Sequence, residues 1–215
     1  MKQFENHLKS LISNIKYYCN NDIQKILYLH NFIQATVEYP NIKLFKILDK
    51  KFPLLNPLNN LQRNYFTVYG TLINKEAHCF GIAKTVKLIL NNPEINIKCK
   101  TIVGYIKNLA KGKIIHIWNI IIIDDKTYHL DTTFDITRNL NTIKKNMSFK
   151  ESLNEISGSK ATKFCYERFL VGESKLKNTH LWNENKYPIC RVDYPIDSIK
   201  HEINQLKNKG LKFVY

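Results

Sequence analysis

Arginine is scarce in this sequence, although the chain is strongly basic. Lys and Arg together number 33 against 18 acidic residues, a formal net charge of +15, yet only four of the 33 are Arg. Arg is the side chain best suited to bidentate recognition of phosphate and guanine, and no motif that mixes basic and aromatic residues occurs. We therefore do not expect specific nucleic-acid binding. The alternative, a protein that binds nucleic acid or membrane surfaces by charge alone, would show a steep salt dependence.

Long apolar runs and closely spaced cysteines are also missing. The longest apolar candidate, residues 114–123, has ten residues and contains His116 and Asn119, so we expect no membrane span. No apolar signal core follows Met1. The five cysteines are odd in number, widely spaced and without a C-x-x-C pair, which argues against a disulfide framework and a structural zinc site. These absences predict a cytoplasmic protein, and we expect no metal and no cofactor.

Glycine and proline are too few for a fibrous or low-complexity chain. There are seven Gly and six Pro among 215 residues, of which 44% are hydrophobic, and a chain of this size can bury a substantial core. We predict one domain over residues 1–215, of the α+β class. Apolar spacing predicts helices at 3–18, 22–37, 79–90 and from 197 or 198, and strands at 98–107, 113–123, 126–134 and 164–171.

Three short motifs follow one another in the middle of the chain. They are HCFG at residues 78–81, HIWN at 116–119 and DTTFD at 131–135. The first begins a predicted helix, where the positive end of the helix dipole and the free N–H groups favour the thiolate form of Cys79. The same N–H groups can bind the oxyanion of a tetrahedral intermediate. We expect Gly81 to leave space beside the sulfur for a substrate backbone.

The turn between the second and third predicted strands decides which side chains share a face. If it has two residues, Ile123 pairs with Lys126, and the same register puts His116 and Asp131 on one face as diagonal neighbours. A carboxylate in that position can hold an imidazole in one tautomer. We therefore predict Cys79 as nucleophile, His116 as general base and acid, and Asp131 as the orienting carboxylate.

In this order and context, the three motifs resemble those of the transglutaminase-like superfamily, circularly rearranged relatives of papain-type proteases. Members carry Cys at a helix start, then His-x-Trp-Asn, then Asp-x-Thr-(Trp/Phe)-Asp on neighbouring strands. Residues 64–136 carry the resemblance well, and the stretches on either side, which include Tyr39 and His180, carry it loosely. The resemblance implies a papain/transglutaminase-like fold, with N-terminal helices and a catalytic helix packed on an antiparallel sheet.

Two positions beside the nucleophile depart from the family pattern. Many members have Gly or another small residue before the Cys, where this chain has His78, and Phe80 is larger than the usual neighbour. Both affect substrate access, and we expect His78 at the rim of the cleft. His129 is expected at the surface or rim. No cluster of acidic loops indicates the calcium sites of animal transglutaminases.

Other residues near the motifs are candidates for lesser roles. Tyr69 and Gln62 are the candidates for a side-chain oxyanion donor, with a structural role as the alternative for each. Trp118 is expected in the core beneath the triad, and Asp135 as a structural acid. His180 is a candidate for the neighbourhood of the cleft.

The predicted triad performs acyl transfer at a carboxamide or peptide carbonyl through a thioester. Attack by water gives hydrolysis or deamidation, and attack by a lysine amine gives a crosslink. We favour hydrolysis, and hence a cysteine protease or amidase with a protein or peptide substrate; an amine acceptor is the partner in the crosslinking outcome. Two alternatives are an acyltransferase or glycan-amidase with the same triad, and a non-catalytic binding or scaffold module that keeps the fold.

Overall fold

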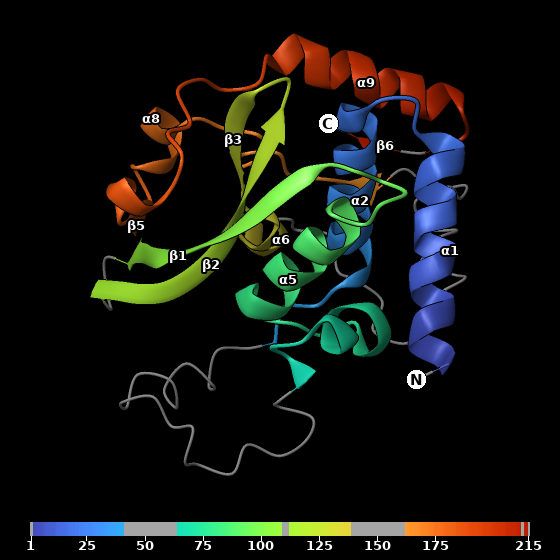
Figure 1. The fold of residues 1–215 in the computed structure, drawn as a ribbon, viewed down its shortest axis with the longest axis horizontal. Helices are drawn as coiled ribbons and strands as arrows, with labels where there is room; N and C mark the ends of the chain where they lie inside the picture. Colours follow the sequence, from blue (N-terminus) through green and yellow to red (C-terminus); the bar gives the residue numbers. More distant parts are fainter. Residues whose placement is uncertain (1, 41–63, 109–111, 139–161, 212, 215) are drawn as a thin grey trace.

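Helices and a curled antiparallel sheet pack side by side in the computed structural model (Figure 1). The model describes residues 2–40, 64–108, 112–138, 162–211 and 213–214. The sheet has four strands in the order β3 (Lys126–Leu130), β2 (Gly112–Ile123), β1 (Lys98–Asn108) and β5 (His180–Trp182). A separate pair is formed by β4 (Thr162–Lys163) and β6 (Phe213–Val214). The expected α+β class is confirmed at this level. Within the described residues, no helix combines the length and the apolar character needed to cross a bilayer.

The N-terminal helices form as the sequence predicts. α1 spans Lys2–Tyr18 and α2 spans Asp22–Thr36, and the Asn21 side chain caps α2 by accepting from the backbone N–H of Gln24 at 2.9 Å. All residues of α2 from Ile26 onward are buried. A helix that is covered on all sides is a central element. Accordingly, α2 contacts α1, α5 (Cys79–Leu90), α6 (Thr132–Arg138) and α9 (Ile196–Asn208).

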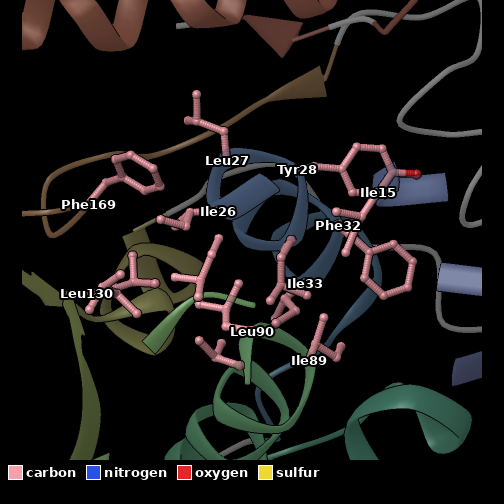
Figure 2. Close-up of a cluster of buried hydrophobic side chains, with 14 of the residues drawn as sticks. Ile15, Ile26, Leu27, Tyr28, Phe32, Ile33, Ile89, Leu90, Leu130 and Phe169 are labelled. Carbon is pink, nitrogen blue, oxygen red and sulfur yellow. The ribbon is translucent and has the colours of Figure 1, made fainter. Parts of the chain in front are cut away.

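The core lies where α2 meets α5, which spans Cys79–Leu90 as predicted. Figure 2 shows Ile33 of α2 beside Ile89 and Leu90 of α5. The three side chains are fully buried. Because this apolar contact fixes α5 against the helical half of the molecule, it also fixes the end of α5 at which Cys79 lies.

The β2–β3 hairpin has the register that the sequence predicts. β1 spans Lys98–Asn108, β2 spans Gly112–Ile123, β3 spans Lys126–Leu130 and β5 spans His180–Trp182. Ile123 pairs with Lys126 across a two-residue turn, whose residues Asp124 and Asp125 both have positive φ angles of 47° and 58°. Positive φ at both central residues is the geometry that matches the twist of a hairpin.

The third strand is shorter than predicted. It ends at Leu130, and Thr132–Arg138 forms helix α6 instead of continuing the strand. The reason is local, because Asp131 Oδ1 accepts from the backbone N–H of Phe134 at 3.0 Å, the bond of an N-cap residue. Asp131 therefore lies at the junction of β3 and α6, and the predicted strand pairing of residues 131–134 is wrong.

The predicted strand at 164–171 is also wrong. Only Val171 pairs, in an isolated bridge with His129, and Leu170 has a left-handed φ of 50° that interrupts extended structure. Arg168 turns its backbone N–H to the carboxylate of Asp135. The short strands nearby are β4 at Thr162–Lys163 and β6 at Phe213–Val214, which pair in parallel.

The last part of the described chain covers the sheet edge and the helices. α8 spans Glu173–Leu176 and leads to β5, which pairs antiparallel with β1. α9 spans Ile196–Asn208, close to the predicted start, and buries Ile199, Ile203 and Leu206. Figure 1 shows α9 lying across the ends of α1 and α2.

Candidate active site

Cys79 lies at the first position of α5 and is 1% exposed. The first backbone hydrogen bond at this end runs from the Ile82 N–H to the His78 carbonyl at 3.1 Å. The N–H groups of residues 79–81 therefore have no acceptor within the helix, as at every helix start. A thiol here is next to both the positive end of the helix dipole and free donors.

His116 of β2 lies between Cys79 and Asp131. Its Nε2 is 2.7 Å from Asp131 Oδ2, and the Cys79 thiol hydrogen-bonds to the same imidazole. The structure thus brings together the three residues that the sequence singles out, in the order thiol, imidazole, carboxylate.

The charges of this trio support one another. Burial alone lowers the pKa of His116, but the charge and hydrogen bond of Asp131, together with Cys79, outweigh it and raise that pKa to about 10. Burial alone raises the pKa of Asp131, but the charge and hydrogen bond of His116, with a contribution from His180, hold it well below its ordinary value. At neutral pH the pair is therefore an imidazolium and a carboxylate.

Asn119 sets the distance between the strand and the helix of the site. Its side-chain amide donates to the Ala83 carbonyl of α5 at 3.0 Å and to Cys99 Sγ at 3.4 Å. It is buried on the opposite face of β2 from His116. Asn119 thus ties the strand that carries His116 to the helix that carries Cys79.

Trp118 packs in the core beside the histidines, as predicted. Its ring stacks on His116 with an interplanar angle of 19° and meets His180 edge-on at 4.9 Å. Its indole N–H donates to His129 Nδ1 at 3.1 Å. The indole therefore covers both imidazoles, and its own polar group is satisfied.

His78, expected at the cleft rim, and His129, expected at the surface or rim, are both buried instead. His78 is enclosed by the rings of Tyr39, Tyr65 and Phe66, with the Tyr39 and His78 ring centroids 5.0 Å apart, and burial lowers its pKa to about 4. His129 is fully buried beneath Trp118, and burial is the main cause that lowers its pKa to about 3. Both predictions are wrong because aromatic rings from other parts of the chain cover these positions. The alternation of side chains along a strand does not reveal such packing.

The space beside Gly81 is filled by the protein's own backbone. A Cβ at this position would lie 2.7 Å from the Tyr65 carbonyl oxygen and 2.9 Å from that of Thr67. Gly81 therefore serves the close approach of residues 65–67 to α5, and the expectation that it leaves room for substrate is wrong.

Of the two candidates for a side-chain oxyanion donor, the structure describes Tyr69 but not Gln62. Tyr69 is 41% exposed and stacks on Phe4 of α1; among the described residues, no contact of Tyr69 reaches Cys79 or His116. Gln62 lies outside the described residues.

Tyr39 is a further neighbour of Cys79 and Asp131. Glu38 pairs with Glu76 in an isolated bridge, which puts Tyr39 beside the start of α5. Burial raises the pKa of Tyr39, and the charges of Cys79 and Asp131 raise it further. The phenol is therefore neutral at the site. Its placement depends on a pairing between distant segments, and no local sequence pattern signals it.

His30 and Asp135 form a second buried pair on the helical side. His30 Nε2 lies 3.2 Å from Asp135 Oδ2, and His30 Nδ1 lies 3.0 Å from Thr132 Oγ1. Asp135 also accepts from the backbone N–H of Arg168. These bonds join α2, α6 and the segment after β4, so Asp135 has the structural role expected from the sequence, and His30 shares it.

One set of side chains within the described part of the chain converges as metal ligands can. It consists of His116, Asp131 and His180, whose donor atoms lie within 4.8 Å of one another. Ligand atoms around a tetrahedral zinc ion are about 3.4 Å apart, given bonds of about 2.1 Å. The two His–Asp separations are 2.7 Å and 2.9 Å, which are hydrogen-bond lengths. The geometry thus favours a hydrogen-bonded cluster.

Comparisons with known proteins find a distant likeness to solved structures. No family model matches the chain, and no curated protein matches it. A solved structure described as "Crystal structure of a TGase" is 17% identical with a TM-score of 0.46, and the match covers 69% of this chain but 36% of that one. This likeness does not assign the chain to a family. A functional assignment depends on the geometry of Cys79, His116 and Asp131.

Proposed function

We propose that the protein is a cysteine-dependent enzyme of the transglutaminase-like type that transfers acyl groups from amide or peptide bonds. The observation that carries the proposal is the continuous contact from the Cys79 thiol through His116 to Asp131, at the N-terminus of α5. A buried imidazole between a thiol and a carboxylate is the arrangement that activates a cysteine nucleophile.

Each residue has a defined part in the proposed reaction. The sulfur of Cys79 attacks the carbonyl carbon, and the carbonyl oxygen takes the negative charge beside the free N–H groups of residues 79–81. His116 gives its proton to the departing nitrogen as the C–N bond breaks, which leaves a thioester on Cys79 and a neutral imidazole. His116 then takes a proton from the incoming water or amine, whose attack releases Cys79 as thiolate. Asp131 orients the His116 ring throughout and stabilises its charged form before and after the thioester stage.

The identity of the second reactant decides the name of the activity. Water gives peptide hydrolysis or deamidation, and a primary amine gives a crosslink. We favour water, and hence a protease or amidase that acts on a protein or peptide. The same groups serve a glycan-amidase or another acyltransferase, because the triad does not distinguish one substrate amide or one acceptor from another.

The experiment uses one incubation with three product readouts. Unstructured peptides that contain Gln and Lys are incubated with the protein and a labelled primary amine, and mass spectrometry scores new peptide ends, deamidated Gln and amine incorporation. Cys79→Ala and His116→Ala should each lower the formation of the main product by about 10³-fold or more. Cys190→Ala is the matched control, since that thiol is also fully buried but has no imidazole among its contacts.

Two results would overturn the proposal. One is product formation that survives Cys79→Ala. The other is the absence of all three products across the peptide panel while the protein remains folded, which would favour the non-catalytic binding or scaffold module.

A further inference from the structure

A second histidine lies against the carboxylate of the proposed triad. His180 of β5 is fully buried, and its Nε2 is 2.9 Å from Asp131 Oδ2, the same oxygen that His116 contacts. Its other nitrogen, Nδ1, is 2.8 Å from the hydroxyl of Thr179. The mechanism proposed above uses neither residue.

The donors and acceptors of this chain of contacts have one consistent direction. Arg168 can only donate, and its Nη2 lies 3.3 Å from Thr179 Oγ1, so the threonine oxygen accepts there. The Thr179 hydroxyl hydrogen is then free for His180 Nδ1 at 2.8 Å, which is closer than the competing Leu176 carbonyl at 3.3 Å. With Nδ1 as an acceptor, a neutral His180 carries its hydrogen on Nε2 and donates it to Asp131.

The surroundings of His180 keep it neutral. Burial lowers its pKa, and the positive charges of His116 and Arg168 lower it further against the opposing effect of Asp131. His129, the other titratable group close by, is itself held neutral by burial. A neutral donor supplies Asp131 with a hydrogen bond without adding a second positive charge that would compete with His116.

Three hydrogen bonds reach the side-chain carboxylate of Asp131. Phe134 N–H donates to Oδ1 at 3.0 Å, while His116 and His180 share Oδ2. Apart from His116 itself, the Phe134 N–H on Oδ1 would be the one remaining donor of these three without His180. With His180, each oxygen has a donor that is independent of His116, and these two donors fix the plane of the carboxylate and with it the direction of the bond to His116.

We propose that His180 and Thr179 are positioning residues for Asp131, with Arg168 anchoring Thr179, so that a hydrogen-bond relay from Arg168 to Asp131 fixes the proposed triad. This inference rests on the proposed function of Cys79 and His116. The relay belongs to the segment 168–180, which is separate in sequence from the β2–β3 hairpin. Val171 of this segment bridges His129 of β3, and His180 pairs with Ile106 of β1.

Paired variants separate the hydrogen bond from the packing. His180→Met removes the donor at similar volume, whereas His180→Gln keeps an amide donor at the same reach. Thr179→Val removes the hydroxyl and Thr179→Ser keeps it. The first readout is the rate at which iodoacetamide alkylates Cys79 at pH 7, measured by mass spectrometry on the full chain, which requires no known substrate. The exposed residue His201 of α9 supplies a control in His201→Met.

The expected pattern is loss and rescue. His180→Met should lower the Cys79 rate by about 10-fold or more, in the range that outer partners of a site contribute, and His180→Gln should recover most of it. Thr179→Val should have a smaller effect in the same direction, and Thr179→Ser should recover it. At high pH the rate changes as His116 loses its proton, and this part of the rate-against-pH profile is its upper limb. In His180→Met the upper limb should move to lower pH, because a loosened Asp131 raises the pKa of His116 less, while burial still lowers it.

The outcomes distinguish this inference from the proposed function. Equal losses in Met and Gln variants that follow their melting temperatures would mean a packing role and would overturn the relay. An unchanged rate and an unchanged upper limb in His180→Met would also overturn it. If His116→Ala leaves the Cys79 rate unchanged, the proposed function itself fails, whatever the His180 variants do.

Discussion

Alkylation of the five cysteines gives a direct test of the ion pair. The perturbation is His116→Ala, which removes the imidazole while leaving Cys79 at the N-terminus of α5. In the unaltered protein we expect iodoacetamide to label Cys79 first at pH 7. Exposure alone predicts the opposite order, because Cys165 is partly exposed whereas Cys79 is buried.

The size of the expected preference follows from the other four thiols. Burial is the largest cause that raises the pKa of Cys19, Cys99, Cys165 and Cys190, each to about 12. At pH 7 each is then thiolate in about one molecule in 10⁵. A thiolate at Cys79 held by the His116 imidazolium should therefore react at least about 10²-fold faster, even after allowance for its limited access and lower intrinsic nucleophilicity.

The assay follows each cysteine by mass spectrometry over pH 5 to 9, under conditions in which the protein stays folded. His116→Ala should remove most of the preference for Cys79, and His201→Met should leave it unchanged. Labelling of Cys165 before Cys79, or a preference for Cys79 that persists in His116→Ala, would refute the ion-pair reasoning. In the second case the helix terminus alone would be activating the thiol.

Three further predictions concern stability and geometry. Gly81→Ala should lower the free energy of unfolding, measured by urea titration, by about 1–3 kcal/mol through overpacking, although helix propensity alone favours Ala by about 1 kcal/mol. The control Lys87→Ala, at an exposed site of the same helix, should change the free energy of unfolding little. Asn119→Ala should cost about 1–3 kcal/mol from the acceptor left buried in α5 and slow Cys79 alkylation, and a normal alkylation rate would contradict its positioning role. The raised pKa of His116 gives stability that is present below about pH 6.5 and is lost as pH rises through about 10, so the fall in melting temperature above pH 8 should flatten in Asp131→Asn.

Local patterns predicted the parts of the site that local forces determine. The register of Ile123 with Lys126 follows from a two-residue turn, and the start of α5 at Cys79 follows from apolar spacing and the stop after Leu90. The contact of His116 with Asp131 was predicted through a strand that in fact ends at Leu130. Asp131 directly follows the end of β3, so its side chain still reaches His116 on the neighbouring strand β2. The predicted contact is therefore present, although the predicted strand pairing at Asp131 is not.

Contacts between distant segments could not be predicted in this way. His180 reaches Asp131 because β5 pairs with β1, with Ile106 opposite His180, and a three-residue strand leaves no periodic signal. The burial of His78 and His129 likewise depends on rings from other elements. In each case the sequence pattern fixes a side chain's own element, while the partner element decides what covers it.

The balance of buried charge gives the relay a second physical reason. In the proposed resting state, Asp131 and the Cys79 thiolate carry negative charge in an environment where unpaired charge is costly. His116 supplies one positive charge. Arg168, also buried, supplies another, and its guanidinium donates to neutral oxygens of Glu167 and Thr179 and lies 4.5 Å from the ring of Phe134. Replacing Arg168 with Met should therefore lower the Cys79 alkylation rate at pH 7 more than it lowers the rate of any other thiol, whereas a uniform change at all five would mean that Arg168 serves packing alone.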